Sequence, residues 1–101
     1  MVERIYEIRW NKSARTQLKA IYDYVQKDSL QSAIKIINTI IDTTETLNRN
    51  PERFGIDKLK KANDGSYRYV EIYRYRVAFR IYHSHIRILR IRSTDQEPLG
   101  Y

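Results

Sequence analysis

Apolar and polar residues alternate along the C-terminal half of the chain in a pattern that predicts three β-strands. The alternating runs are Tyr67–Tyr73, Tyr75–Tyr82 and Ile86–Arg92, and a period of two residues is typical of strands. The residues around His83–His85 leave room for a tight turn between the last two runs. We therefore expect an antiparallel meander.

The middle strand separates its side chains most clearly into two faces. Val77, Phe79 and Ile81 point one way, and a second set points the other way. This second set consists of Arg74, Arg76, Ala78 and Arg80. We expect helices to cover the first set, so the second set should line an open, cationic surface of the sheet.

The N-terminal half changes from a period of two to a helical period. Alternation from Ile5 to Trp10 predicts a short strand, and apolar residues then recur at helical spacing from Lys12 to about Lys27. Asn11 is the expected N-cap of this helix. Ser29 is the expected N-cap of a second helix, which ends where Asn48–Pro51 removes helical propensity. The two apolar stripes should pack as a helical hairpin.

Residues 51–66 show no clear period and predict a long loop. The expected order of elements is therefore β-α-α-β-β-β, an α+β fold with an antiparallel sheet and a two-helix hairpin packed on one face. A length of 101 residues and a 42% share of hydrophobic residues fit a single domain over residues 1–101.

The basic residues are concentrated in one part of the chain. Residues 58–92 hold ten Lys or Arg against two acids, although the whole chain has a formal net charge of only +7. The remainder is therefore close to neutral. Because this segment is also the one expected to form the open sheet face, the face should suit a polyanion or an acidic protein.

Composition excludes several classes of site. The chain has no Cys and only two His, and it has no glycine-rich phosphate loop, so we expect no metal and no organic cofactor. The N-terminus lacks the apolar run of a signal peptide, and no stretch approaches the roughly 20 apolar residues of a membrane span. We expect a soluble, cytoplasmic protein without a membrane partner.

In this arrangement the chain resembles the RelE/ParE toxins of bacterial type II toxin–antitoxin modules over nearly its full length. The resemblance rests on Trp10 before the first helix, Ala14, Leu18, Ile21 and Tyr24 within it, Ala33 and Ile37 in the second helix, Leu47 to Pro51 and Gly55, Tyr67-Arg68, Tyr75 to Ile81, Ile86 to Ile91, and Gln96-Glu97-Pro98. It implies a small growth-inhibiting toxin that a cognate acidic antitoxin holds inactive.

The resemblance leaves two targets open. Some members of the family cleave messenger RNA on the ribosome, and others inhibit DNA gyrase. For cleavage, the resemblance implies a metal-independent endoribonuclease with Arg76 binding the phosphate, Arg68 near it and Tyr101 as a proton-transfer group. The expected RNA-binding residues are Lys58, Lys60, Lys61, Arg74, Arg80 and Arg92.

The sequence departs from the ribonucleolytic members just past the last strand. Those members carry a His or Arg there, whereas this chain has Ser93, Thr94, Asp95 and Gln96. We rank ribosome-dependent cleavage of mRNA first and gyrase inhibition through protein contact second. A degenerate member that only binds its antitoxin is the third hypothesis.

Overall fold

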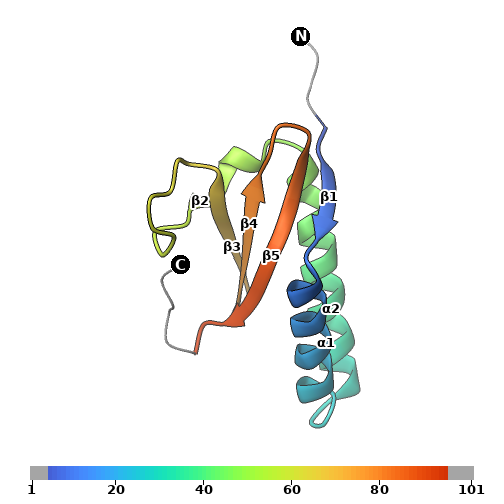
Figure 1. Cartoon of the computed structure of the whole chain (residues 1–101). Helices are drawn as coiled ribbons and strands as arrows, with labels where there is room; N and C mark the ends of the chain where they lie inside the picture. The colour runs from blue at the N-terminus through green and yellow to red at the C-terminus, as the bar shows by residue number, and fades with distance from the viewer. Residues whose placement is uncertain (1–4, 96–101) are drawn as a thin grey trace.

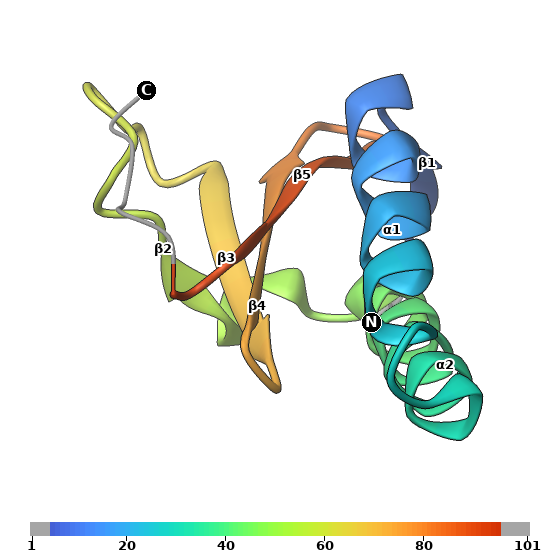
Figure 2. The ribbon, with the colours of Figure 1, turned by 90° about the horizontal axis from the view of Figure 1, so that it is seen from below.

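A hairpin of two helices packs against one face of a five-stranded sheet in the computed structural model, which describes residues 5–95 (Figures 1 and 2). The elements are β1 (Glu7–Trp10), α1 (Lys12–Val25), α2 (Leu30–Glu45), the 3-10 turns η1 (Thr46–Asn48) and η2 (Pro51–Arg53), β2 (Gly55–Ile56), β3 (Tyr67–Ile72), β4 (Tyr75–Ile81) and β5 (His85–Ser93). The predicted α+β fold class is confirmed. Neither helix is long and apolar enough to cross a membrane.

The sheet is mixed, which differs from the antiparallel sheet that we expected. Its strand order is β1-β5-β4-β3-β2, and β1 pairs with β5 in the parallel direction. The register pairs Ile8 with Ile86 and Trp10 with Ile88. Because paired residues share a face, this pairing adds the two apolar side chains of β1 to the core.

The three strands of the meander are antiparallel as expected, with one irregularity that the sequence pattern concealed. Ala78 pairs with Arg90 while Phe79 pairs with Ile88, so Leu89 is an extra residue in β5. This bulge lets Ile88 and Ile91 both face the core although they are three residues apart. As a consequence, Arg87, Arg90 and Arg92 share the opposite face.

The apolar face of the sheet meets the helices in the core. Phe79, Val77 and Ile88 are fully buried there, together with Ile40 of α2 and Ala14 of α1. The predicted division of β4 into an apolar and a cationic face is therefore confirmed. Ala78 is the exception on the second face, since it is also buried.

The two helix N-termini differ in how they are capped. Ser29 accepts a hydrogen bond from the backbone N–H of Ser32 at 3.1 Å, as an N-cap serine should. Asn11 stands at the N-cap position of α1 but makes no side-chain capping bond. Its Oδ1 instead accepts a 3.0 Å hydrogen bond from Nη1 of Arg87. The expected capping role of Asn11 was therefore wrong, because a cross-strand arginine takes its acceptor atom.

Replacing Ser29 with alanine should lower the free energy of unfolding by about 1 kcal/mol, because the N–H of Ser32 then loses its acceptor. Chemical denaturation followed by circular dichroism would measure this change. Ser32→Ala is the matched control, since only its backbone takes part in the cap, and it should change the free energy by less than about 0.5 kcal/mol. Equal losses for both variants would contradict the assignment of the cap.

The segment expected to be an aperiodic loop contains a strand. β2 pairs with β3 in the antiparallel direction, with Gly55 opposite Tyr69 and Ile56 opposite Arg68. A strand of two residues is too short to show a period, so the sequence could not reveal it. β2 lies at the edge of the sheet next to β3 (Figure 1), and the loop that follows it brings Asp57 to within 2.9 Å of Arg76 on β4.

Candidate functional site

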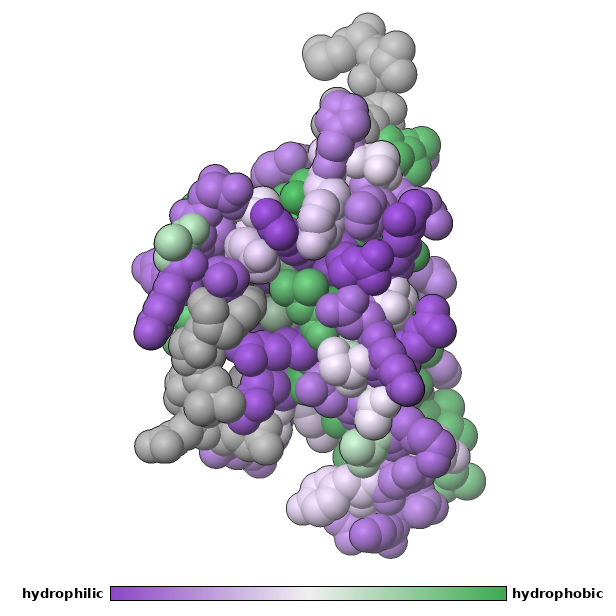
Figure 3. Space-filling view, in the orientation of Figure 1, coloured by the Kyte–Doolittle hydropathy of each residue, from purple (hydrophilic) through white to green (hydrophobic). Residues whose placement is uncertain are grey.

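The face of the sheet turned away from the core carries most of the charged and aromatic side chains of the strands. In Figure 3, hydrophilic residues cover most of the side of the molecule that is seen in the orientation of Figure 1. The register of the strands places the following residues on this open face: Glu7, Arg9, Tyr67, Tyr69, Glu71, Arg76, Arg80, His85, Arg87, Arg90 and Arg92. The expected cationic surface is therefore present.

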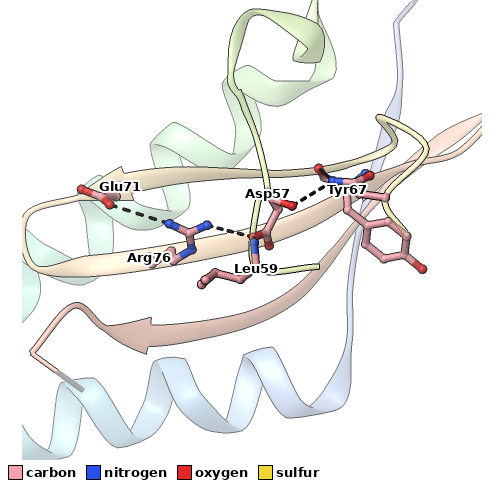
Figure 4. Close-up of polar contacts among 6 residues, drawn as sticks. Asp57, Leu59, Tyr67, Glu71 and Arg76 are labelled. Atoms are coloured by element: carbon pink, nitrogen blue, oxygen red, sulfur yellow. Dashed lines mark hydrogen bonds and ion pairs between the residues drawn. The ribbon is translucent and has the colours of Figure 1, made fainter. Parts of the chain in front are cut away.

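At the centre of this face, Arg76 is paired with a buried carboxylate (Figure 4). Its Nη2 lies 2.9 Å from Oδ1 of Asp57, whose side chain is fully buried, and its Nη1 lies 3.9 Å from Glu71. The guanidinium also stacks 3.6 Å from the centre of the Tyr69 ring. The side chain of Arg76 is only 21% exposed. Its position is therefore fixed on several sides.

The loop that supplies Asp57 is built around that residue and Asn63. Oδ1 of Asp57 also accepts from the backbone N–H of Leu59 at 3.0 Å, and its own N–H donates to the carbonyl of Tyr67 at 2.9 Å. Nδ2 of Asn63 donates to the carbonyls of Asp57 and Tyr67 at 3.0 and 2.8 Å, while its Oδ1 accepts from the N–H of Gly65. Residues 57–67 are thus held together by specific hydrogen bonds.

Arg68 lies on the other face of the sheet from Arg76. It pairs with Phe79 in the register, and its guanidinium donates to three backbone carbonyls. The acceptors are Glu52 and Phe54, both at 2.9 Å from Nη1, and Gly65 at 3.0 Å from Nε. Arg68 thereby ties η2 and β2 to the start of β3. The structure does not bring the guanidinium groups of Arg68 and Arg76 together.

The third residue expected in a catalytic role, Tyr101, lies outside the described residues, as does Gln96. The departure from the ribonucleolytic pattern at Ser93–Asp95 falls at the end of β5 and in the following turn. The catalytic roles of Arg76, Arg68 and Tyr101 remain predictions.

Two of the expected RNA-binding residues meet at a second cluster on the open face. Nζ of Lys60 lies 4.9 Å from the centre of the Tyr67 ring. The guanidinium of Arg80 lies 4.6 Å from Tyr67 and 4.8 Å from Tyr82, and the ring of Tyr82 stacks on His85 at 4.5 Å. Cations and rings therefore form one continuous stack across β3, β4 and β5.

The surroundings shift the pKa values of two members of this stack in opposite directions. The hydrogen bond to the Tyr82 hydroxyl raises the pKa of Arg80 above its ordinary value. Partial burial of its ring, together with the positive charges of Arg9 and Arg87, lowers the pKa of His85. These surroundings favour the neutral form of the His85 ring.

The other expected RNA-binding residues lie elsewhere. Lys58 and Lys61 are exposed on the loop. Arg74 is exposed in the turn between β3 and β4, where it pairs with Asp95 at 3.4 Å. Arg92 borders a cavity of about 590 Å³ between α1 and the ends of β4 and β5. The predicted set is therefore spread over both ends of the sheet.

Sequence reasoning missed Asp57, the residue on which the site depends. Asp57 immediately precedes the three lysines of a segment without periodicity, so it looked like an exposed loop residue. The only available signal was that a lone acid stands at the start of a strongly basic stretch. Nowhere within residues 5–95 do three or more His, Cys, Asp or Glu gather as a metal ion would require.

Comparisons with known proteins agree with this architecture. The family model described as "ParE toxin of type II toxin-antitoxin system, parDE" matches residues 8–98. The chain is similar in structure to the chromosomal ParDE toxin–antitoxin system from P. aeruginosa, with 24% identity, a TM-score of 0.69, and coverage of 89% of this chain and 97% of that chain. It is also similar to the toxin–antitoxin complex RelBE2 from Mycobacterium tuberculosis, with 20% identity, a TM-score of 0.63, and coverage of 88% and 91%. No curated protein sequence matches it.

Proposed function

The chain belongs to the family of ParE toxins of type II toxin–antitoxin systems, and from this premise we propose that it arrests growth by binding a protein target, DNA gyrase, rather than by cutting RNA. Gyrase is the protein target that the family resemblance implies. The sequence alone led us to rank mRNA cleavage first and gyrase inhibition second, and this proposal reverses that ranking.

The observation that carries the proposal is the pairing of Arg76 with buried Asp57 at 2.9 Å. A catalytic arginine must direct its full positive charge at the phosphate when negative charge develops there. Here a carboxylate already takes that charge, and Glu71 adds a second negative charge 3.9 Å away. With Arg68 turned to the other face, the Arg76 cluster is poorly suited to catalysis, which favours action through protein contact.

We infer that the partner which restrains this toxin is an acidic antitoxin bound to the open face. The concentration of positive charge in residues 58–92 supports electrostatic steering of an acidic protein, with fast and salt-sensitive association. Both structural neighbours are toxin–antitoxin systems or complexes. A short acidic protein encoded beside this gene would be the candidate partner.

Ribosome-dependent cleavage of mRNA is the second candidate function. The clustering of Lys60 and Arg80 around Tyr67 favours it, because single-strand-binding proteins follow the phosphate backbone with a positively charged groove. If RNA is cleaved on this face, Arg76 would stabilise the negative charge that develops on the phosphate mainly in the transition state.

Induction of the protein in a bacterium is expected to stop colony formation and to trap gyrase on broken DNA. Trapped gyrase–DNA complexes and codon-phased cuts in mRNA would be measured in the same cultures, and co-expression of the adjacent acidic protein should restore growth. Codon-phased cuts without trapped gyrase would overturn the proposed target. Normal growth with a folded protein would leave the degenerate, antitoxin-binding hypothesis.

A paired substitution separates binding from catalysis. Asp57→Asn with Arg76→Met removes both charges while leaving an acceptor for the N–H of Leu59. If the toxin acts by protein contact elsewhere on the sheet, this variant should still arrest growth. If it cuts RNA, loss of the stabilising arginine should slow cleavage on programmed ribosomes by roughly 10² or more.

A further inference from the structure

Three arginines stand in register across three adjacent strands of the open face. Arg80 of β4 is directly opposite Arg87 of β5, and Arg87 is directly opposite Arg9 of β1. On the other side of Arg80, the same line continues to Tyr67 of β3, whose ring also contacts Lys60. We call Arg9, Arg87 and Arg80 the transverse row.

Within residues 5–95, no carboxylate contacts Arg80 or Arg87 directly, although Asp64 accepts a hydrogen bond from Ser66, the residue to which Arg80 donates. Arg80 donates to the hydroxyls of Ser66 and Tyr82, and Arg87 donates to the amide oxygen of Asn11. None of these acceptors is a carboxylate. Arg9 pairs with Glu7 at 2.9 Å, but both side chains are exposed, so the pair is weak and screened by salt.

This arrangement costs the folded protein stability. Like charges directly opposite one another on neighbouring strands repel. Arg76 has its charge balanced by the buried Asp57 and by Glu71, whereas the only carboxylates near the transverse row within the described residues are the exposed Glu7 and Asp64, and Asp64 reaches Arg80 only through Ser66. A bound anion would relieve the repulsion, so the row is a candidate anion site.

The row is also held in place before any ligand arrives. Arg80 is confined between the rings of Tyr67 and Tyr82, and the hydrogen bond from Arg87 to Asn11 orients the second guanidinium. Arginines fixed in this way lose less conformational entropy on binding than free ones do. Guanidinium groups match the oxygens of phosphate well.

From these features we propose that the transverse row binds the phosphodiester backbone of duplex DNA. Three adjacent strands span about 10 Å, over which B-DNA presents about six phosphate charges. The rings beside the row already stack on cations or on each other. They therefore offer no open platform for unpaired bases, on which single-strand binding depends. The transverse row therefore recognises phosphate groups, which a DNA duplex exposes without separation of its strands.

This inference goes beyond the proposed function, because it assigns a nucleic acid contact that requires no gyrase. It would place DNA against one end of the open face while leaving the Arg76 cluster for other contacts. Its failure would leave the growth-arrest experiment unaffected, since that experiment detects trapped gyrase in cells.

The test uses the purified full-length chain and a fluorescent 20-base-pair duplex, with anisotropy measured over a range of salt concentrations. Arg80→Gln and Arg87→Gln should each weaken binding by on the order of tenfold at 0.1 M salt, and each should reduce the slope of log K against log salt by about one. Arg15→Gln is the matched control, because Arg15 is exposed on α1. Circular dichroism would establish that each variant is folded.

Two competitors decide whether the ligand is correct. A single-stranded RNA of the same length and poly-glutamate would each be titrated against the bound duplex. The proposal expects both to compete more weakly than unlabelled duplex. Tighter binding of RNA through the same arginines would overturn the assignment to duplex DNA, and tighter binding of poly-glutamate would assign the row to an acidic protein. Parental affinity and salt slope in both row variants would remove the row from DNA binding.

Discussion

Asp57→Ala is expected to lower the free energy of unfolding by about 3–5 kcal/mol. The substitution leaves the guanidinium of Arg76 largely buried without its carboxylate, and breaking a buried ion pair on one side has a cost of this size. It also removes the acceptor for the N–H of Leu59, so the loop should loosen. Urea denaturation followed by circular dichroism would measure the loss.

The double variant Asp57→Asn with Arg76→Met provides the control. Because neither charge remains, it should recover a large part of the stability that Asp57→Ala loses. A loss for Asp57→Ala below about 1 kcal/mol would show that the pair does not hold the loop. A double variant as unstable as Asp57→Ala would show that the loop depends on the carboxylate itself rather than on charge balance.

Phe79→Ala should destabilise the protein by about 3–5 kcal/mol, since it removes a fully buried ring from the centre of the core. The ring of Phe79 also meets that of Phe54 edge to face at 6.1 Å, so the variant loses the contact that anchors the start of β2. Thermal and urea denaturation would both report the change.

Tyr24→Ala is the comparison for this substitution. Tyr24 is 72% exposed on α1, so its replacement should change the free energy of unfolding by about 0.5 kcal/mol or less. If Phe79→Ala cost as little as Tyr24→Ala, the core would not be centred on β4 as the structure has it.

The periodic parts of the fold could be predicted from sequence because each has enough residues to display a period. Both helices and the three long strands were located within a few residues. β2 has two residues and shows no period, and the pairing of β1 depends on residues about 78 positions away. Local pattern carries no information about such partners.

The site was predictable as a surface and not as a set of contacts. Alternation in β4 correctly placed Arg76 and Arg80 on the open face. It could not show that Arg76 is paired, because Asp57 reaches it from an aperiodic loop. Arg68 was predicted to act beside Arg76, but the register of β3 places it on the core side, opposite Phe79. Only the three-dimensional structure shows the carbonyls that it binds.

The pairing of the first strand with the last has a consequence for synthesis on the ribosome. Trp10 can pair only after Ile88 has been made, so β1 joins the sheet after all the residues between them have been synthesised. Contacts so distant along the chain form slowly, because their loop-closure entropy must be overcome first. A partly made chain lacks the Arg9–Arg87–Arg80 row and a closed core. Synthesis that stops before Ile88 therefore yields a chain in which β1 has no partner strand and the open face is incomplete.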